Sequence, residues 1–138
     1  METAFAALRT TAMIFVVVAI SFGIYLHQLA RITASTAAVA AATAAAQSLD
    51  KASWDCTETH TGWAEAQKAA AQAAATRTRA RSAATATGYT LTTEPSCTVV
   101  ATVTVGAAGV HRWLEATAAA CRPSRVAYTP GWAVAPPC

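Results

Sequence analysis

The sequence predicts an α+β membrane protein with one long N-terminal transmembrane helix that continues outside the membrane, a second alanine-rich helix, a small β-hairpin and a proline-rich tail held by disulfides. Three observations predict this arrangement. An uncharged apolar run begins after Thr11, an alanine-rich stretch follows at 31–49, and all four cysteines lie beyond the apolar run. The predicted parts are the N-terminal segment and anchor 1–30, the helical extension 31–49 and a small extracytoplasmic, disulfide-stapled domain 50–138.

The first predicted element is a membrane-spanning helix. Residues 12–26 carry no charge, and their neighbours extend the tolerated length to about 20 residues, enough to cross a bilayer. A cleaved secretory signal is the alternative, but such a signal has a basic start and a small-x-small cleavage site. The start here carries Glu2 and no clean site follows, which favours a retained anchor.

The orientation of this helix follows from the cysteines and not from the charges. Arg9 lies on one side of the apolar run, and Arg31 and Lys51 lie on the other, so the positive-inside rule does not decide. Disulfides persist outside the cytoplasm. We therefore predict a single-pass protein of the cell membrane with a cytoplasmic N-terminus and an extracytoplasmic C-terminal domain.

Small residues along this helix predict contact with other helices. Gly23 leaves a flat spot for a neighbour, and the Ser21 hydroxyl can bond to the backbone one turn earlier. The extension 31–49 has no glycine or proline, so a continuous helix of about 45 residues is expected. The expected partners are other membrane protein subunits and membrane lipid. The predicted helix-packing residues are Ser21, Gly23, Ala34, Ala38, Ala41 and Ala45.

The remaining elements are read from turn residues and alternation. A loop is predicted at 50–62, a second helix from 64 to about 84 that Gly88 ends, and strands at 89–93 and 97–105 joined by a turn at 94–96. Residues 110–121 predict a short helix or an irregular segment. The second strand alternates, with Val99, Ala101, Val103 and Val105 on one face and Thr98, Thr102 and Thr104 mostly on the other.

The four cysteines predict two disulfides, because their number is even and no C-x-x-C spacing occurs. The favoured pairs are Cys56 with Cys97 and Cys121 with Cys138. Crossed pairing, Cys56 with Cys121 and Cys97 with Cys138, stays open at this point. The alternative of a metal site would combine Cys56 and His60 with Cys97, Cys121 and His111, and disulfides explain the cysteines with fewer assumptions.

Enzymatic and nucleic-acid-binding functions are not expected. Carboxylates are few in the outer part, and neither a glycine-rich phosphate loop nor a nucleophile elbow occurs. The only basic cluster is Arg77, Arg79 and Arg81, too small for several phosphate contacts. It could contact anionic lipid head groups or an acidic partner, and a solvated face is the favoured interpretation. We therefore predict no catalytic residue, no metal, no cofactor, no small-molecule substrate and no nucleic-acid partner. The tryptophans, Trp54, Trp63, Trp113 and Trp132, are interpreted as core residues.

The order of these parts resembles the TadE-like proteins of tight-adherence (Flp) pilus systems, in their actinobacterial form. The resemblance covers roughly residues 1–105. It rests on the acidic start and apolar helix at 2–26, the alanine-rich stretches at 32–46 and 64–75 and the Val/Thr strand at 99–105. It implies a pseudopilin-like subunit whose apolar helix packs in a filament or an inner-membrane assembly platform. Glu2 is the sole N-terminal acid and no glycine-ended basic leader precedes it, which departs from the processed pilins.

A second hypothesis is an accessory subunit of a large membrane complex, respiratory or secretory, whose outer domain caps larger partners. The same small-residue helix would serve both roles. One or two fixed copies in a purified complex would favour this second hypothesis. Many helically arranged copies would favour the filament.

Overall fold

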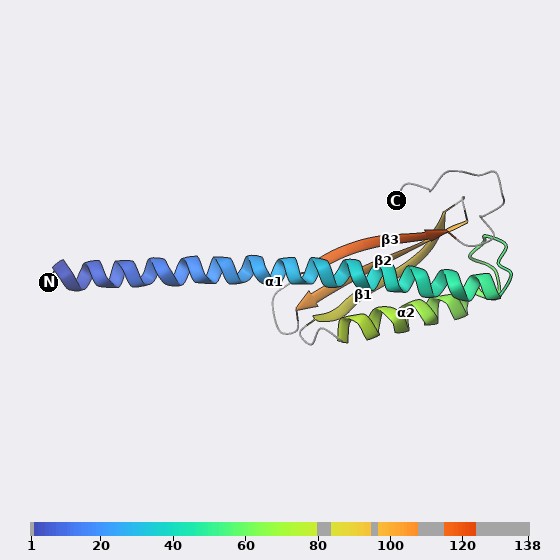
Figure 1. Ribbon diagram of the computed structural model, residues 1–138, viewed down its shortest axis with the longest axis horizontal. Helices are drawn as coiled ribbons and strands as arrows, with labels where there is room; N and C mark the ends of the chain where they lie inside the picture. The colour runs from blue at the N-terminus through green and yellow to red at the C-terminus, as the bar shows by residue number, and fades with distance from the viewer. Residues whose placement is uncertain (1, 80–83, 95–96, 108–114, 124–138) are drawn as a thin grey trace.

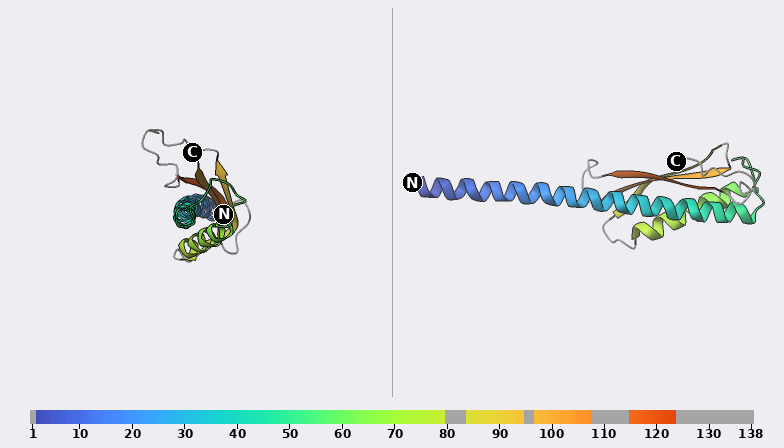
Figure 2. Two further views of the ribbon diagram at one scale, coloured as in Figure 1. Left: turned by 90° about the vertical axis from the view of Figure 1, so that its right-hand side faces the viewer. Right: turned by 45° about the horizontal axis from the view of Figure 1, so that its top comes forward.

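The computed structural model describes residues 2–79, 84–94, 97–107 and 115–123. The elements in chain order are α1 (Glu2–Lys51), α2 (Trp63–Arg79), β1 (Ala84–Glu94), β2 (Thr98–Ala107) and β3 (Ala116–Pro123). The strands form one antiparallel sheet in the order β1-β2-β3. Both helices pack on one face of this sheet, and α1 extends far beyond it (Figure 1; Figure 2).

Helix α1 is continuous over 50 residues, which confirms the predicted long helix and gives it a length of about 75 Å. Gly23 is its only glycine and it contains no proline, so nothing breaks the backbone hydrogen bonding. The first half stands alone, whereas the second half lies against the sheet and α2 (Figure 1). Burial above nine-tenths begins at Ala30.

Helix α1 ends in a Schellman-type motif without a glycine. Ser53 takes a positive φ of 52°, and the Trp54 amide donates to the Leu49 carbonyl at 3.2 Å. Such a motif brings the residue after the turn back onto the last helical turn. Trp54 and Leu49 are accordingly both buried, and Trp54 is the largest fully buried side chain, so the turn that ends the helix also places a large part of the core.

Helix α2 begins beside the end of α1 and runs back along it (Figure 1). The Gly62 carbonyl accepts from the Ala66 amide at 3.0 Å, which makes Gly62 the residue that caps the helix. A Cβ on Gly62 would lie 2.7 Å from the Ala52 Cβ, so only glycine fits between the two helices here. The Trp63 ring then stacks on Trp54 with centroids 5.9 Å apart, and both tryptophans are core residues as predicted.

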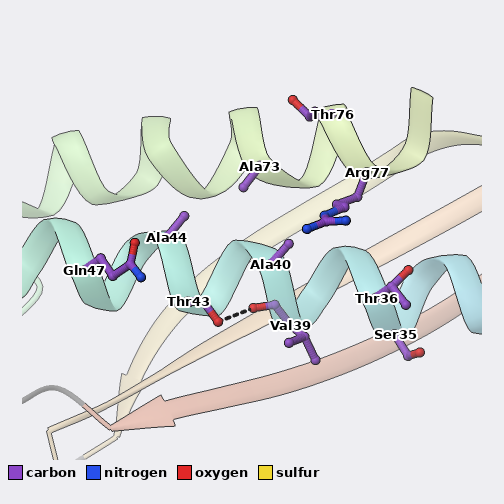
Figure 3. Close-up of a pocket in the computed structure, with 10 residues that line it drawn as sticks. All are labelled: Ser35, Thr36, Val39, Ala40, Thr43, Ala44, Gln47, Ala73, Thr76 and Arg77. Carbon is purple, nitrogen blue, oxygen red and sulfur yellow. Dashed lines mark hydrogen bonds between the residues drawn. The ribbon is translucent and has the colours of Figure 1, made fainter. Parts of the chain in front are cut away.

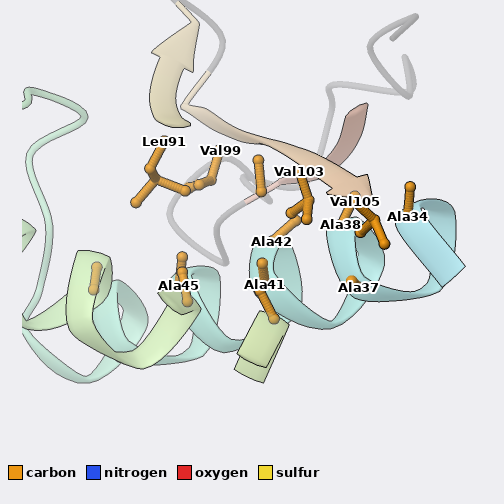
Figure 4. Packing of buried hydrophobic residues seen from close by; sticks show 14 of the residues in the cluster. Ala34, Ala37, Ala38, Ala41, Ala42, Ala45, Leu91, Val99, Val103 and Val105 are labelled. Carbon is orange, nitrogen blue, oxygen red and sulfur yellow. The ribbon is translucent and has the colours of Figure 1, made fainter. Parts of the chain in front are cut away.

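The core is built mainly from alanine, so the helices and the sheet approach closely. Buried alanines of α1 face Leu91 of β1 and the inward valines of β2 (Figure 4). Val99, Ala101, Val103 and Val105 are all fully buried, which confirms the predicted alternation. Thr98 is also fully buried and departs from this alternation. Thr98 lies at the end of the sheet, next to Cys97 of the disulfide.

The third strand corrects the sequence-based expectation. Residues 110–121 were expected to form a short helix or an irregular segment and the sheet to be a hairpin, but β3 pairs with β2 from Ala116 opposite Val105 to Pro123 opposite Thr98. Alanine propensity favours helix, and tertiary pairing overrides it. The Arg122 Nε donates to the Thr43 hydroxyl at 3.2 Å, which ties β3 to α1.

The boundary between α2 and β1 also differs from the expectation. Helix α2 ends at Arg79 and not near residue 84, and β1 begins at Ala84. Gly88 therefore lies inside a strand and does not end the helix; a register irregularity falls between Ala86 and Gly88. Glycine inside a strand commonly marks such an irregularity. The predictions for Arg81, His111, Trp113, Trp132, Cys138 and the proline-rich tail fall outside the described residues.

Candidate functional site

The candidate site is the N-terminal half of α1, which no other part of the described chain covers. Its large apolar side chains are mostly exposed, from 55% at Val16 to 71% at Phe15. The helix is long and apolar enough to cross a membrane, and its most apolar 18-residue window is 0% buried. A signal sequence near the N-terminus meets the same test of length and composition.

The polar side chains of this half are satisfied by their own helix. The hydroxyls of Thr10 and Thr11 donate to carbonyls four residues earlier at 2.9 Å. The Ser21 hydroxyl donates to the Val17 carbonyl at 2.8 Å, as expected from its position. Because a helix supplies its own backbone partners and these hydroxyls are also bonded internally, the surface offers few unmet polar groups to an apolar environment.

Among the predicted helix-packing residues, the structure separates two groups. Ala34, Ala38, Ala41 and Ala45 are each 0% exposed and contact the sheet and α2 of the same chain (Figure 4). Their close packing is therefore internal. Ser21 is exposed and Gly23 partly exposed, so contact between these two positions and another helix stays a prediction.

The far end of the domain is closed by a disulfide between Cys56 and Cys97, whose Cα atoms lie 4.9 Å apart. This pair is the one favoured from the sequence, and it excludes crossed pairing of these two cysteines. Cys121 is also disulfide-bonded, and its predicted partner Cys138 lies outside the described residues. Thiols that are bonded to one another do not serve as metal ligands, and within the described residues no group of His, Cys, Asp and Glu has metal-binding geometry.

The loop that carries Cys56 is held by short polar contacts. The Thr57 hydroxyl donates to the Asp55 carboxylate at 2.8 Å, and this hydrogen bond holds the pKa of Asp55 below its ordinary value. The Glu58 carboxylate accepts from the Thr93 amide at 3.0 Å, and the His60 Nδ1 accepts from the Gly62 amide at 3.0 Å. These polar groups stabilise the loop, so the geometry gives them a structural role.

A shallow groove runs between α1 and α2. Ala40 and Ala44 of α1 and Ala73 of α2 form its floor, and the Arg77 guanidinium lies over it (Figure 3). Val39 at its edge is 41% exposed. The groove contains no carboxylate, histidine or thiol that would act as a nucleophile or a general base.

Comparison with known proteins gives no family. No family model, no curated protein and no solved structure matches this chain. A function is therefore inferred from the geometry of the chain itself and from the sequence resemblance.

The sequence did not predict which basic residues share one end of the domain. Arg31 of α1 and the arginines at the end of α2, Arg77 and Arg79, lie at the same end of the domain because α2 runs antiparallel to α1 (Figure 1). Arg31 is separated from them by more than forty positions in the chain. Only the direction of α2 places them at the same end of the domain, and the reversal at 50–62, which the sequence predicted, was the available signal for that direction.

Proposed function

We propose that this chain is a non-enzymatic, single-pass membrane protein that acts as a pseudopilin-like structural or assembly subunit of a pilus or secretion system. One observation carries the proposal: a single unbroken helix has one half with an apolar window that is 0% buried and another half embedded in a folded domain. The bare half needs lipid or other helices to cover it, because large apolar patches are not left in water. The resemblance to TadE-like proteins supports the choice of assembly.

The continuous helix α1 couples the position of the bare half to that of the domain. A helix without a break transmits position and orientation from the covered half to the domain, since its backbone hydrogen bonds continue through both halves. The alanine packing of the second half fixes the domain on the helix. A neighbour that binds the bare half would therefore set the position of the whole domain, which suits a subunit of an assembly.

Substitution at Gly23 tests whether the bare half packs against other helices. Gly23→Leu adds a bulky side chain at the flat spot and should push a neighbouring helix away. Val17→Leu is the control, since it replaces one exposed apolar side chain with another of similar character. We expect Gly23→Leu to reduce recovery of the chain with its partners after mild detergent extraction, and Val17→Leu to leave the recovery unchanged.

Equal and negligible effects of the two substitutions would overturn the packing role. The number of copies per assembly then separates the two candidate assemblies. Many helically arranged copies support the pseudopilin-like subunit, whereas one or two fixed copies in a purified complex support the accessory subunit of a larger membrane complex.

A further inference from the structure

We propose that the membrane-facing end of the domain binds anionic phospholipid headgroups through Arg31 and Arg79. The inference rests on the proposed insertion of α1 in a bilayer and goes beyond it, because it assigns a lipid class to a surface outside the spanning segment. The antiparallel course of α2 brings Arg79 to the same end of the domain as Arg31 (Figure 1).

The position of these residues along α1 puts them near a bilayer surface. Residues 10–29 make about 20 residues of helix, or about 30 Å, the thickness of the hydrocarbon core. Arg31 follows within about 3 Å, and side chains on a helix lean toward its N-terminus. The Arg31 side chain therefore leans toward the membrane, and it is exposed.

The end of α2 lies only slightly farther out. Arg77 lines the same groove as Thr36 and Ala40 of α1 (Figure 3), and Arg79 is two residues farther toward the bare half. Arg79 is thus level with the first exposed turns of the extension, about 8–12 Å beyond residue 29. The headgroup layer is about 5–8 Å thick and the Debye length is about 8 Å at physiological salt, so the backbone at Arg79 lies within the electrostatic range of the lipid phosphates. Its long, flexible side chain can extend back toward them.

The guanidinium groups of Arg31 and Arg79 are available for a ligand. Both residues are exposed, and within the part of the chain that the structure describes neither has an ion pair or a hydrogen bond. Glu115 is the one acidic residue described at this end of the domain. Guanidinium groups bind phosphate well because their donors form a fixed planar fork.

The opposite end of the domain carries the contrasting charge. Asp50, Asp55, Glu58 and Glu65 lie at the end of α1, in the loop and in the first turn of α2. Lys51 and Lys68 lie among them, and Arg122 of β3 lies opposite Val99 toward the same end. The domain is therefore basic toward the membrane and acidic away from it. An anionic lipid surface attracts the basic end and would hold the domain with its acidic end away from the membrane.

Lipid selectivity of the full-length chain tests the inference. The chain is reconstituted in phosphatidylcholine vesicles that contain phosphatidylglycerol, and spin-labelled versions of the two lipids report which one it retains. We expect a preference for phosphatidylglycerol of roughly fivefold for each arginine in contact, which disappears in about 1 M salt, where the Debye length is about 3 Å.

Matched variants locate the preference. R31Q/R79Q should bring the preference close to one, and R79Q alone should lower it without altering the anchor helix. K51Q/K68Q removes the same charge from two exposed residues at the far end and should leave the preference unchanged. If the chain floats with the vesicles but shows no lipid preference, or if both double variants lose the preference equally, the inference is wrong but insertion of α1 in the membrane is still supported. A chain that does not float with vesicles would overturn both.

Discussion

Single residues decide how closely the two helices of this domain can pack. Gly62 is buried, caps α2 and lies against the last turn of α1. Gly88, by contrast, lies in β1 with only Thr104 near the position of a Cβ. The two glycines therefore have different structural roles, although both were interpreted from the sequence as residues that end a loop or a helix. A matched pair of alanine substitutions separates these roles.

Gly62→Ala should destabilise the protein. The new Cβ would lie 2.7 Å from the Ala52 Cβ, so the junction between the helices must shift, at a cost of about 1–3 kcal/mol. Gly88→Ala meets Thr104 atoms at 3.5 and 3.6 Å, an ordinary contact, and should change the free energy of unfolding by less than about 1 kcal/mol. Denaturant unfolding in detergent measures both, and equal effects would contradict this account of the junction.

Tyr89 gives a prediction of pH dependence. Burial raises the pKa of Tyr89 from 10.0 to about 12, because the charged phenolate is disfavoured in the partly buried site. A raised pKa means that the neutral group contributes stability that is fully present below pH 10 and is lost as the pH rises toward 12. Wild-type protein should therefore lose more stability over this range than Tyr89→Phe, for which the other titrating groups are the same.

The same substitution should stabilise the protein at neutral pH. The Tyr89 hydroxyl is buried and has no hydrogen-bond partner within the described residues, and removing such a group is favourable by about 1 kcal/mol. Thermal unfolding at pH 7 measures this effect. Lower stability of Tyr89→Phe at pH 7 would show that the hydroxyl has a partner.

The loop at 52–62, which reverses the chain between α1 and α2, is fixed at both of its ends. A Schellman-type turn ends α1, Gly62 begins α2, and the Cys56–Cys97 disulfide joins the loop between them to the start of β2. The bridge spans 41 positions of sequence and encloses α2 and β1. It therefore limits the freedom of half of the domain in the unfolded chain.

Removal of this bridge should cost a large share of the stability of the domain. Cys56→Ala/Cys97→Ala should lower the free energy of unfolding by about 4 kcal/mol, the loop-closure value for a separation of 41 residues. Thr61→Ala/Thr92→Ala changes two exposed residues of the same region and should have an effect below about 1 kcal/mol. A small loss in the cysteine variant would mean that the alanine core alone stabilises the domain.

The elements also show what sequence can and cannot predict. Helix α1 and the inward valines of β2 were predictable, because an unbroken apolar and alanine-rich run and a clean alternation are local patterns. Strand β3 was not, because residues 116–121 are mostly alanine and only pairing with β2, which is not local, makes them a strand. Likewise, the small face of Ala34, Ala38, Ala41 and Ala45 was visible in the sequence, but not that the sheet and α2 of the same chain cover it.

The two ends of the molecule differ in surface chemistry. One end of α1 is a bare apolar helix that extends beyond the domain (Figure 1). The middle of the molecule carries exposed arginines, and the far end carries the disulfide and most of the acidic residues. A bilayer around the bare half fits this order, because it covers the apolar side chains and places the bridged cysteines at a distance from the membrane. We therefore propose that α1 anchors the chain in a membrane and that the rest of the chain lies outside the cytoplasm.

Thiol labelling of intact cells tests this proposed topology. Cells are treated with a membrane-impermeant reductant and a membrane-impermeant maleimide, and the chain is then recovered from carbonate-washed membranes. We predict that Cys56 and Cys97 react in intact cells only after reduction, and that the labelled chain remains in the membrane fraction. Labelling that needs lysis but no reductant, or a chain that the carbonate wash releases, would contradict the account.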